Sequence, residues 1–157
     1  MTRLLFVCLG NIIRSPLAEH LFQFQAEQAE VADKYSVDSA GTAAWHVGEA
    51  PDPRMRKTAE SHGVSYSGSA RQVREDDFDD FDWIMAMDGS NRRDLMEMAG
   101  SPDRQAKIRL LRDFDPERTE SDVPDPYYGG AQGFEITYQI VERSVRGLLE
   151  ALEAGEI

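Results

Sequence analysis

The chain has 157 residues, the size of one ordinary domain, so residues 1–157 are expected to form a single domain with a sizeable core. Its net charge of −12, from 17 Lys and Arg against 29 Asp and Glu, argues against general binding to nucleic acid or to an anionic membrane. A single cysteine excludes an intramolecular disulfide and fits a reducing cytosol, so we expect a cytoplasmic protein without a signal peptide or membrane span.

Apolar runs and helical spacing predict strands that alternate with helices. In chain order, we expect a strand at Leu4–Val7, a helix at 15–31, a strand at Tyr35–Ser39, a helix from Asp52 to Gly63, a helical turn with a solvated acidic face within 75–82, a strand at Asp82–Met87, a helix at Ser90–Ala99, a strand at Ile108–Leu111 and a helix at Gly133–Glu153. This alternation predicts a three-layer α/β/α fold with a central, mostly four-stranded parallel sheet. Ligands of such sheets bind beyond the carboxyl ends of the strands.

Cys8 follows the first strand, and five residues separate it from Arg14 at the start of the first helix. Backbone N–H groups at such a turn favour a bound anion, and the same field favours a thiolate. Arg14 can hold two phosphate oxygens with its planar fork. Gly10 and Asn11 tolerate left-handed dihedrals, and Ser15 is expected to cap the helix, to donate to the thiolate, or both. We therefore predict a phosphate loop between the first strand and the first helix, with Cys8 as nucleophile.

The longest irregular segment, from about Phe114 to Ala131, carries two candidates for a general acid, Asp122 and Asp125. Loops of this length in compact domains are usually functional. Hydrolysis of a phosphate monoester by a cysteine needs an acid that protonates the leaving oxygen. Pro126 restricts the backbone of Asp125 to extended conformations and so fixes where its carboxyl group points. Asp125 is therefore preferred, and Asp122 is expected to be a solvated loop carboxylate.

Two separated motifs resemble the low-molecular-weight protein tyrosine phosphatases. Residues 5–19, LFVCLGNIIRSPLAE, resemble the signature loop of that family, and residues 122–130, DVPDPYYGG, resemble its general-acid loop. Shorter matches occur between them in the same order, at residues 37–42, 45–48, 70–72, 86–88 and 90–91. The resemblance spans essentially the whole chain.

This resemblance implies hydrolysis of protein phosphotyrosine through a phosphocysteine on Cys8. Asp125 would protonate the leaving phenolate oxygen and then act as base on the water that cleaves the intermediate. Trp45 and Tyr127 would form the walls of the pocket, and Asn11, Ser15 and Ser39 would support the loop by hydrogen bonds. The residues expected to bind substrate are Leu9, Gly10, Asn11, Ile12, Ile13, Ser15, Trp45 and Tyr127.

Two positions depart from patterns in related proteins. Ile13 stands where many members carry a second cysteine, so an oxidised Cys8 has no neighbouring thiol. Ile12 stands where the similar protein-arginine phosphatases have a threonine, which favours phosphotyrosine over phosphoarginine.

An arsenate reductase shares this loop but needs further cysteines, which are absent. A non-catalytic phosphopeptide-binding module remains an alternative, although it would be expected to lose the thiol or the acid.

The resemblance also bears on partners and cofactors. It implies a phosphotyrosine protein as substrate, suggests a cognate tyrosine kinase, and implies inhibition by inorganic phosphate or other oxyanions. We expect a monomer or weak dimer and no cofactor. His20, His46 and His62 are scattered and lack the spacing of metal ligands, so no metal centre is indicated.

Overall fold

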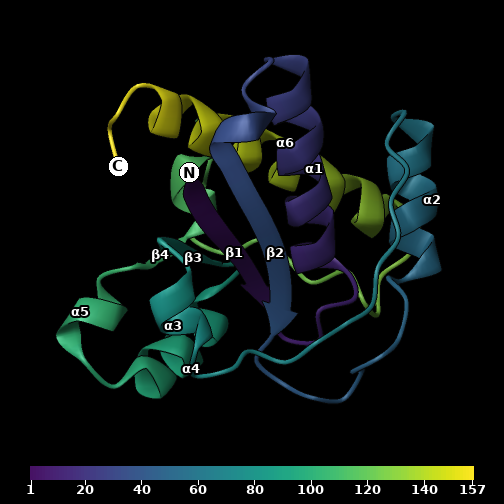
Figure 1. The fold of residues 1–157 in the computed structure, drawn as a ribbon. Coiled ribbons are helices and arrows are strands. Elements are labelled where there is room, and N and C mark those ends of the chain that lie inside the picture. The colour runs from purple at the N-terminus through teal and green to yellow at the C-terminus, as the bar shows by residue number, and fades with distance from the viewer.

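The computed structural model describes residues 1–157 and is built around a four-stranded sheet in the order β2-β1-β3-β4 (Figure 1). The strands are β1 (Thr2–Cys8), β2 (Tyr35–Gly41), β3 (Trp83–Ala86) and β4 (Ile108–Leu110). Every neighbouring pair of strands is parallel, as the sequence predicts. The carboxyl ends of the strands therefore lie at one edge of the sheet, where the loop after Cys8 begins.

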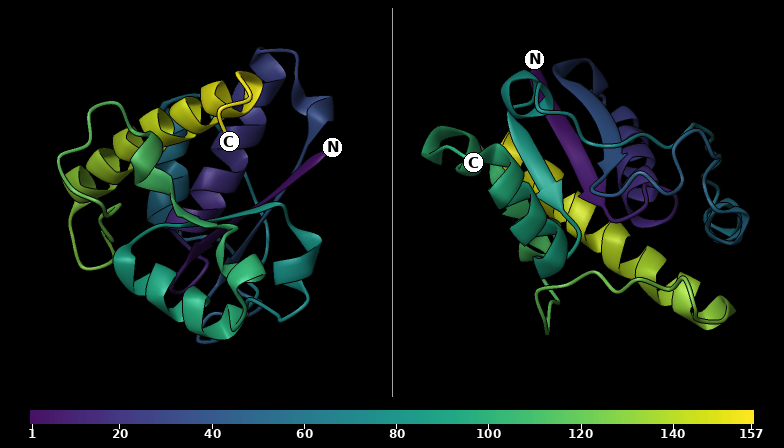
Figure 2. Two further views of the ribbon diagram at one scale, coloured as in Figure 1. Left: turned by 90° about the vertical axis from the view of Figure 1, so that its left-hand side faces the viewer. Right: turned by 90° about the horizontal axis from the view of Figure 1, so that it is seen from below.

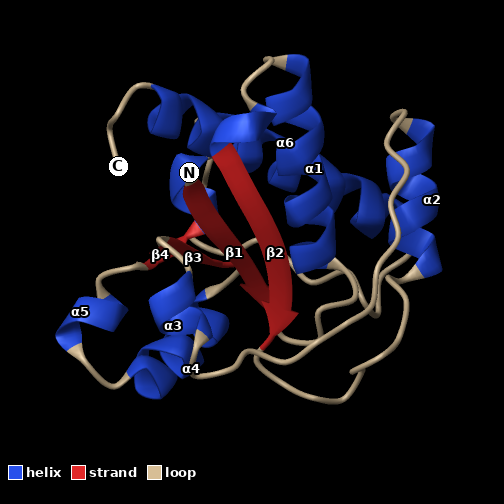
Figure 3. Cartoon of the chain, viewed as in Figure 1, coloured by secondary structure: helices blue, strands red, loops and turns tan.

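Helices cover both faces of this sheet, which confirms the predicted three-layer fold (Figures 2 and 3). The α-helices are α1 (Arg14–Gln28), α2 (Pro53–Ser61), α3 (Asp77–Asp80), α4 (Gly89–Ala99), α5 (Pro102–Gln105) and α6 (Ala131–Glu153), and the 3₁₀ turns are η1 (Ala32–Lys34) and η2 (Leu111–Phe114). The sequence did not predict α5, η1 or η2, because such short helices contain too few turns to show a period. No helix combines the length and the apolar character needed to span a bilayer.

The central strand β1 is buried on both sides, which explains its uninterrupted apolar run. Leu4 and Phe6 face the core shared with α1 and α6, whereas Leu5 and Val7 face the core shared with α4. Cys8 continues this alternation toward the first of these cores. The hydrophobic pattern of β1 thus fixes the side of the sheet on which the cysteine lies.

The first helix differs from the prediction at both ends. It begins at Arg14 and ends at Gln28, a few residues before the expected end. Ile13 is the N-cap residue and no side chain caps the helix, so the prediction that Ser15 is the N-cap is wrong. The Ser15-Pro16 pair is typical of a helix start, but Pro16 is tolerated anywhere in the first turn, because those N–H groups lack helical partners.

The acidic segment at 75–82 contains the short helix α3. Asp77 is nevertheless buried, with an exposed fraction of 1%. Its carboxylate accepts hydrogen bonds from Arg71 Nη1 at 2.9 Å and from the backbone N–H of Arg74 at 2.8 Å. The expected solvated acidic face is therefore wrong at Asp77, because the chain turns back and places Arg71, six residues earlier, against its carboxylate.

Candidate active site

The loop between β1 and α1 curls around the sulfur atom of Cys8. The backbone N–H of Asn11 donates to Cys8 Sγ at 3.3 Å, and Ser15 Oγ lies 3.0 Å from the same sulfur. Ser15 Oγ accepts a hydrogen bond from Asn11 Nδ2 at 2.9 Å, so its own hydrogen can donate to the sulfur at 3.0 Å or to the carbonyl oxygen of Ala40 at the longer distance of 3.4 Å. Both donors stabilise a negative sulfur more than a neutral one.

Asn11 fixes the shape of this loop. Its φ of 56° is left-handed, a conformation that asparagine adopts more readily than most residues. The side-chain Oδ1 accepts from the backbone N–H of Arg71 at 2.9 Å, and Nδ2 also donates to Ser39 Oγ at 3.0 Å. Asn11, Ser15 and Ser39 thus lie behind the loop as a connected set of hydrogen bonds.

Two glycines allow the loop to pack closely against its neighbours. Gly10 does not have the left-handed dihedral that the sequence allowed, but a Cβ atom there would lie 2.9 Å from His46 Cδ2. A Cβ atom on Gly41, at the end of β2, would lie 2.7 Å from the carbonyl oxygen of Leu9. Sequence analysis missed the role of Gly41, because only the folded chain brings β2 against the loop.

Arg14 is buried, with an exposed fraction of 3%, and points into the same site. Its Nη1 donates to Asp88 Oδ2 at 2.7 Å and to the carbonyl of Val123 at 3.0 Å, and its Nη2 lies 3.5 Å from Asp125 Oδ2. Burial disfavours the charged guanidinium, but Cys8, Asp88 and Asp125 outweigh burial and raise the pKa of Arg14 above its ordinary value. A permanent cation is therefore held beside the sulfur.

Asp88 is a second residue that sequence analysis did not assign to the site. Besides its contact with Arg14, its Oδ1 accepts from the backbone N–H of Asn91 at 2.7 Å and caps α4. It lies just beyond the carboxyl end of β3, next to the end of β1. The only available signal was its place in the short match at residues 86–88.

The two candidate acids lie in different places. Asp125 Oδ2 faces Arg14, and Asp125 Oδ1 accepts from the backbone N–H of Tyr127 at 3.1 Å. Asp125 lines the cavity above Cys8 with 41% of its side chain exposed. Asp122 is exposed as expected, but its Oδ1 accepts from the backbone N–H of Gly89 at the start of α4, and it does not line the cavity.

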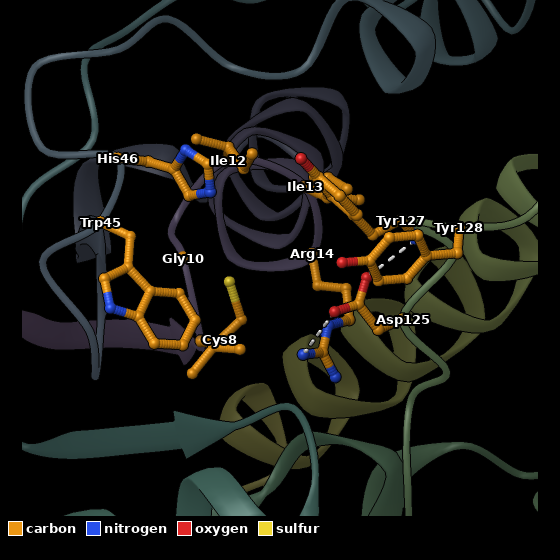
Figure 4. A pocket seen from close by; sticks show the side chains of 11 residues that line it. Cys8, Gly10, Ile12, Ile13, Arg14, Trp45, His46, Asp125, Tyr127 and Tyr128 are labelled. Carbon is orange, nitrogen blue, oxygen red and sulfur yellow. Dashed lines mark hydrogen bonds and ion pairs between the residues drawn. The ribbon is translucent and has the colours of Figure 1, made fainter.

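A cavity of about 250 Å³ opens above Cys8 (Figure 4). Trp45 and His46 lie on one side of the sulfur, and Asp125, Tyr127 and Tyr128 lie on the other. Trp45 lines this cavity and is 72% exposed, so it lies at the rim. The lining residues are Cys8, Leu9, Gly10, Ile12, Ile13, Arg14, Trp45, His46, Asp125, Tyr127 and Tyr128.

Most predicted substrate-binding residues meet at this cavity. Asn11 and Ser15 do not line it, but both contact the sulfur of Cys8, which does. His46 and Tyr128 line it, although sequence analysis did not assign them to the site. The sequence indicated them only as the neighbours of Trp45 and Tyr127. That indication is weak, because neighbouring side chains in a loop often point in different directions. The chain contains no group of three or more His, Cys, Asp or Glu residues placed to hold a metal ion.

Together these groups suit a phosphoryl group. The backbone N–H of Asn11 donates to the Cys8 sulfur, the buried Arg14 guanidinium lines the same cavity, and the Asp125 carboxyl group faces it. Such preorganised donors stabilise negative charge on the oxygens of a transferring phosphoryl group. Aromatic side chains at the mouth provide apolar contact for a flat leaving group.

Comparison with known proteins identifies the family. The family model described as low molecular weight phosphotyrosine protein phosphatase matches residues 3–156. The chain is 43% identical over 152 residues to the low molecular weight protein-tyrosine-phosphatase of Streptomyces coelicolor, covering 96% of this chain and 93% of that protein.

Solved structures agree with this match. A protein tyrosine phosphatase from Entamoeba histolytica with Hepes in its active site has a TM-score of 0.96, at 39% identity, over 100% of both chains. The Drosophila arginine phosphatase has a TM-score of 0.89, at 34% identity, over 98% of both chains. With its loop from β1 to α1, its buried arginine and its late aspartate, the chain belongs to the low molecular weight phosphotyrosine protein phosphatase family.

Proposed function

We propose that the protein is a single-domain phosphatase that hydrolyses phosphotyrosine in other proteins through a phosphocysteine on Cys8. The observation that carries this proposal is the convergence of Cys8, Arg14 and Asp125 on one cavity with aromatic walls. Family membership supports the reaction class. The identity of the acid and the roles of the individual loop residues are our assignments.

In the first step, the sulfur of Cys8 attacks phosphorus in line with the leaving oxygen. The backbone N–H groups of residues 9–14 and the Arg14 guanidinium hold the three non-bridging oxygens. As the S–P bond forms and the P–O bond to the aryl group breaks, Asp125 gives its proton to the leaving phenolate oxygen. Ser15 stabilises the thiolate before attack and after its release.

In the second step, water attacks the phosphocysteine. Asp125, now a carboxylate, accepts a proton from this water, the S–P bond breaks, and inorganic phosphate and the thiolate form. Because the product occupies the same donors as the substrate, inorganic phosphate and similar oxyanions should compete with the substrate. The nucleophile must stay reduced for each cycle, which supports a cytoplasmic location.

The cavity favours an aromatic phosphate ester. Tyr127 is 38% exposed, and its ring lies 6.5 Å from that of His46 across the mouth, measured between centroids. A phosphotyrosine ring would pack beside these rings while its phosphate reaches Cys8, a residue that lines the cavity and is only 3% exposed. The physiological substrate is therefore a phosphotyrosine protein, and a tyrosine kinase that makes this substrate is its functional counterpart.

Phosphoarginine is the second candidate substrate, because an arginine phosphatase shares the fold at 34% identity. Ile12 lines the cavity here with only 9% of its surface exposed. An apolar, branched side chain offers no hydrogen bond to the guanidinium of phosphoarginine, and so favours the aryl ester.

Hydrolysis of p-nitrophenyl phosphate tests the mechanism. Wild type should be active, Cys8→Ser inactive, and Asp125→Ala slower by about 10² to 10⁴, the usual contribution of a general acid. Asp122→Ala is the matched control from the same loop and should retain near wild-type activity. An active Cys8→Ser protein would overturn the mechanism. A panel of phosphotyrosine, phosphoserine and phosphoarginine peptides then tests the substrate class.

A further inference from the structure

We propose that Arg54, on α2, is a positioning residue for the general acid. It connects the acid loop, defined here as residues 115–130, to the phosphate loop, and so sets where Asp125 stands relative to Cys8. This inference rests on the proposed role of Asp125. Nothing in the predicted motifs singled out Arg54, which lies 40 residues beyond Arg14 in the sequence.

One end of this connection lies on the phosphate loop. The backbone N–H of Asp52 donates to the carbonyl oxygen of Ile12 at 2.8 Å. The Asp52 carboxylate is 7% exposed and holds Arg54 from two sides, because Oδ1 accepts from Arg54 N and Nε at 2.8 and 3.1 Å, and Oδ2 accepts from Nη2 at 2.8 Å. Burial raises the pKa of Asp52, but the hydrogen bonds from Arg54 outweigh burial and hold it below its ordinary value.

The other end lies on the acid loop. Arg54 Nη1 donates to the carbonyl oxygen of Tyr127 at 3.0 Å. The same guanidinium lies 5.4 Å from the Tyr127 ring centroid and 4.7 Å from that of Phe134, at distances that favour cation–π attraction. Tyr127 in turn donates its backbone N–H to Asp125 Oδ1 at 3.1 Å. A continuous set of contacts therefore runs from Ile12 through Arg54 to the general acid.

Within the acid loop, residues 125–129 have fewer contacts with the rest of the chain than the residues before them. Upstream, Val123 is held through its N–H by the carbonyl of Met87, and the carbonyl of Pro124 accepts from Thr137 Oγ1. For residues 125–129, Arg54 gives the only hydrogen bond from outside the loop, beside the ion pair of Asp125 with Arg14 at 3.5 Å. Loss of Arg54 would remove this hydrogen bond and leave the ion pair with Arg14 as the one polar contact of residues 125–129 with the rest of the chain.

A misplaced acid has a specific kinetic signature. Leaving groups that depart readily as anions, such as 2,4-dinitrophenolate, need little protonation, whereas phenolate needs the proton of Asp125. We expect Arg54→Ala to lower kcat/KM for phenyl phosphate about tenfold, since small displacements of a catalytic group cost this much or more. The value for 2,4-dinitrophenyl phosphate should change less than about twofold. A purely structural defect would instead lower both values equally.

The test measures kcat/KM across a series of aryl phosphates for wild type, Arg54→Ala and Lys57→Ala. Lys57 is an exposed cation one turn further along α2, and its variant should retain the wild-type dependence on leaving group. The double variant Arg54→Ala/Asp125→Ala should behave like Asp125→Ala alone, because Arg54 acts through the acid. Should Arg54→Ala fail to fold, Arg54→Lys is the second variant, because it keeps a cation but loses the planar fork. Its kcat/KM should also fall more for phenyl phosphate than for 2,4-dinitrophenyl phosphate, by a smaller factor than in Arg54→Ala.

An equal loss for all leaving groups, no loss at all, or an undiminished effect of Arg54→Ala in the Asp125→Ala background would each overturn the inference. Failure of the proposed function is distinguishable, because wild type would then hydrolyse none of the aryl phosphates. If kcat/KM of Asp125→Ala depended on the leaving group no more steeply than that of wild type, the assignment of Asp125 as the general acid would be wrong, whatever the result for Arg54.

Discussion

The phosphate loop and the acid loop meet at one cavity but are held in different ways. The phosphate loop rests on buried side chains, Asn11, Ser15 and Ser39, which hydrogen-bond to one another behind it. Residues 125–129 of the acid loop are largely exposed and have one hydrogen bond from outside the loop. Groups that bind the phosphoryl oxygens work best when fixed in advance. The proposed anion site is thus held by buried hydrogen bonds, whereas the segment with the proposed acid has one hydrogen bond and one ion pair from outside the loop.

Among the residues that support the two loops, the largest expected effect comes from Asn11, which hydrogen-bonds to Ser15, Ser39 and Arg71. Asn11→Ala combines left-handed strain with unsatisfied hydrogen-bond partners at Ser15, Ser39 and the N–H of Arg71. We expect a loss of about 3 kcal/mol in the free energy of unfolding and of about 100-fold in kcat/KM. Denaturant titration and steady-state kinetics measure both quantities.

Asn11→Gly separates the two causes. Glycine accepts the φ of 56° without strain but cannot make the side-chain hydrogen bonds. The glycine variant should regain about 1 kcal/mol of stability and little of the activity. Wild-type activity in either variant would contradict the claim that the buried hydrogen bonds hold the loop.

A pH-dependent effect is expected beneath the same loop, at Glu19. Its Oε1 accepts from Ser39 Oγ at 2.6 Å, and burial raises its pKa to about 7, with Asp38 adding to the shift and Ser39 and Arg71 opposing it. The imidazole of His20 lies 3.7 Å away, but burial lowers the pKa of His20 and so favours its neutral form.

Because the folded chain binds the Glu19 proton more tightly than the unfolded chain, the free energy of unfolding should fall as pH rises from about 4.5 to about 7. Glu19→Gln removes this ionisation, so the variant should match wild type below about pH 4 and be more stable by up to about 3 kcal/mol at pH 8. Thermal unfolding across pH measures the difference. A constant difference between the two proteins at all pH values would refute the assignment.

The smallest effects come from a pair of glycine substitutions that compares the loops directly. A Cβ atom on Gly41 would press on the carbonyl oxygen of Leu9 in the phosphate loop, so Gly41→Ala should destabilise by about 1–3 kcal/mol. Gly130, at the end of the acid loop, has no atom within 4 Å of an added Cβ. Gly130→Ala should therefore change stability by less than about 0.5 kcal/mol. Equal losses would contradict the difference in tethering.

The sequence predicted the parts of the site whose signal is local. Cys8 ends a strand, Arg14 begins a helix, and Pro126 limits the backbone of Asp125, so short-range patterns were sufficient to place these residues. Parallel strands with alternating helices were likewise visible as periods in the apolar residues. The prediction that Ser15 caps the helix was wrong. The Ser-Pro pair is typical of a helix start, but the Ser15 side chain hydrogen-bonds within the phosphate loop instead.

What the sequence could not predict depends on contacts between distant segments. Asp88 binds Arg14 across 74 positions, and Arg54 binds Tyr127 across 73. Gly41 is required only because β2 passes beside the phosphate loop. Such positions carry ordinary residues in ordinary local patterns, and only the packing of loops at the edge of the sheet gives them a role.

The central claim is that Cys8 carries the phosphoryl group during turnover. It is tested most directly by quenching the enzyme in acid during hydrolysis of an aryl phosphate and locating the modification by peptide mass spectrometry. The account predicts one phosphoryl group on the peptide that contains Cys8, lost in Cys8→Ser. A phosphoryl group on any other residue, or hydrolysis that continues in Cys8→Ser, would contradict it.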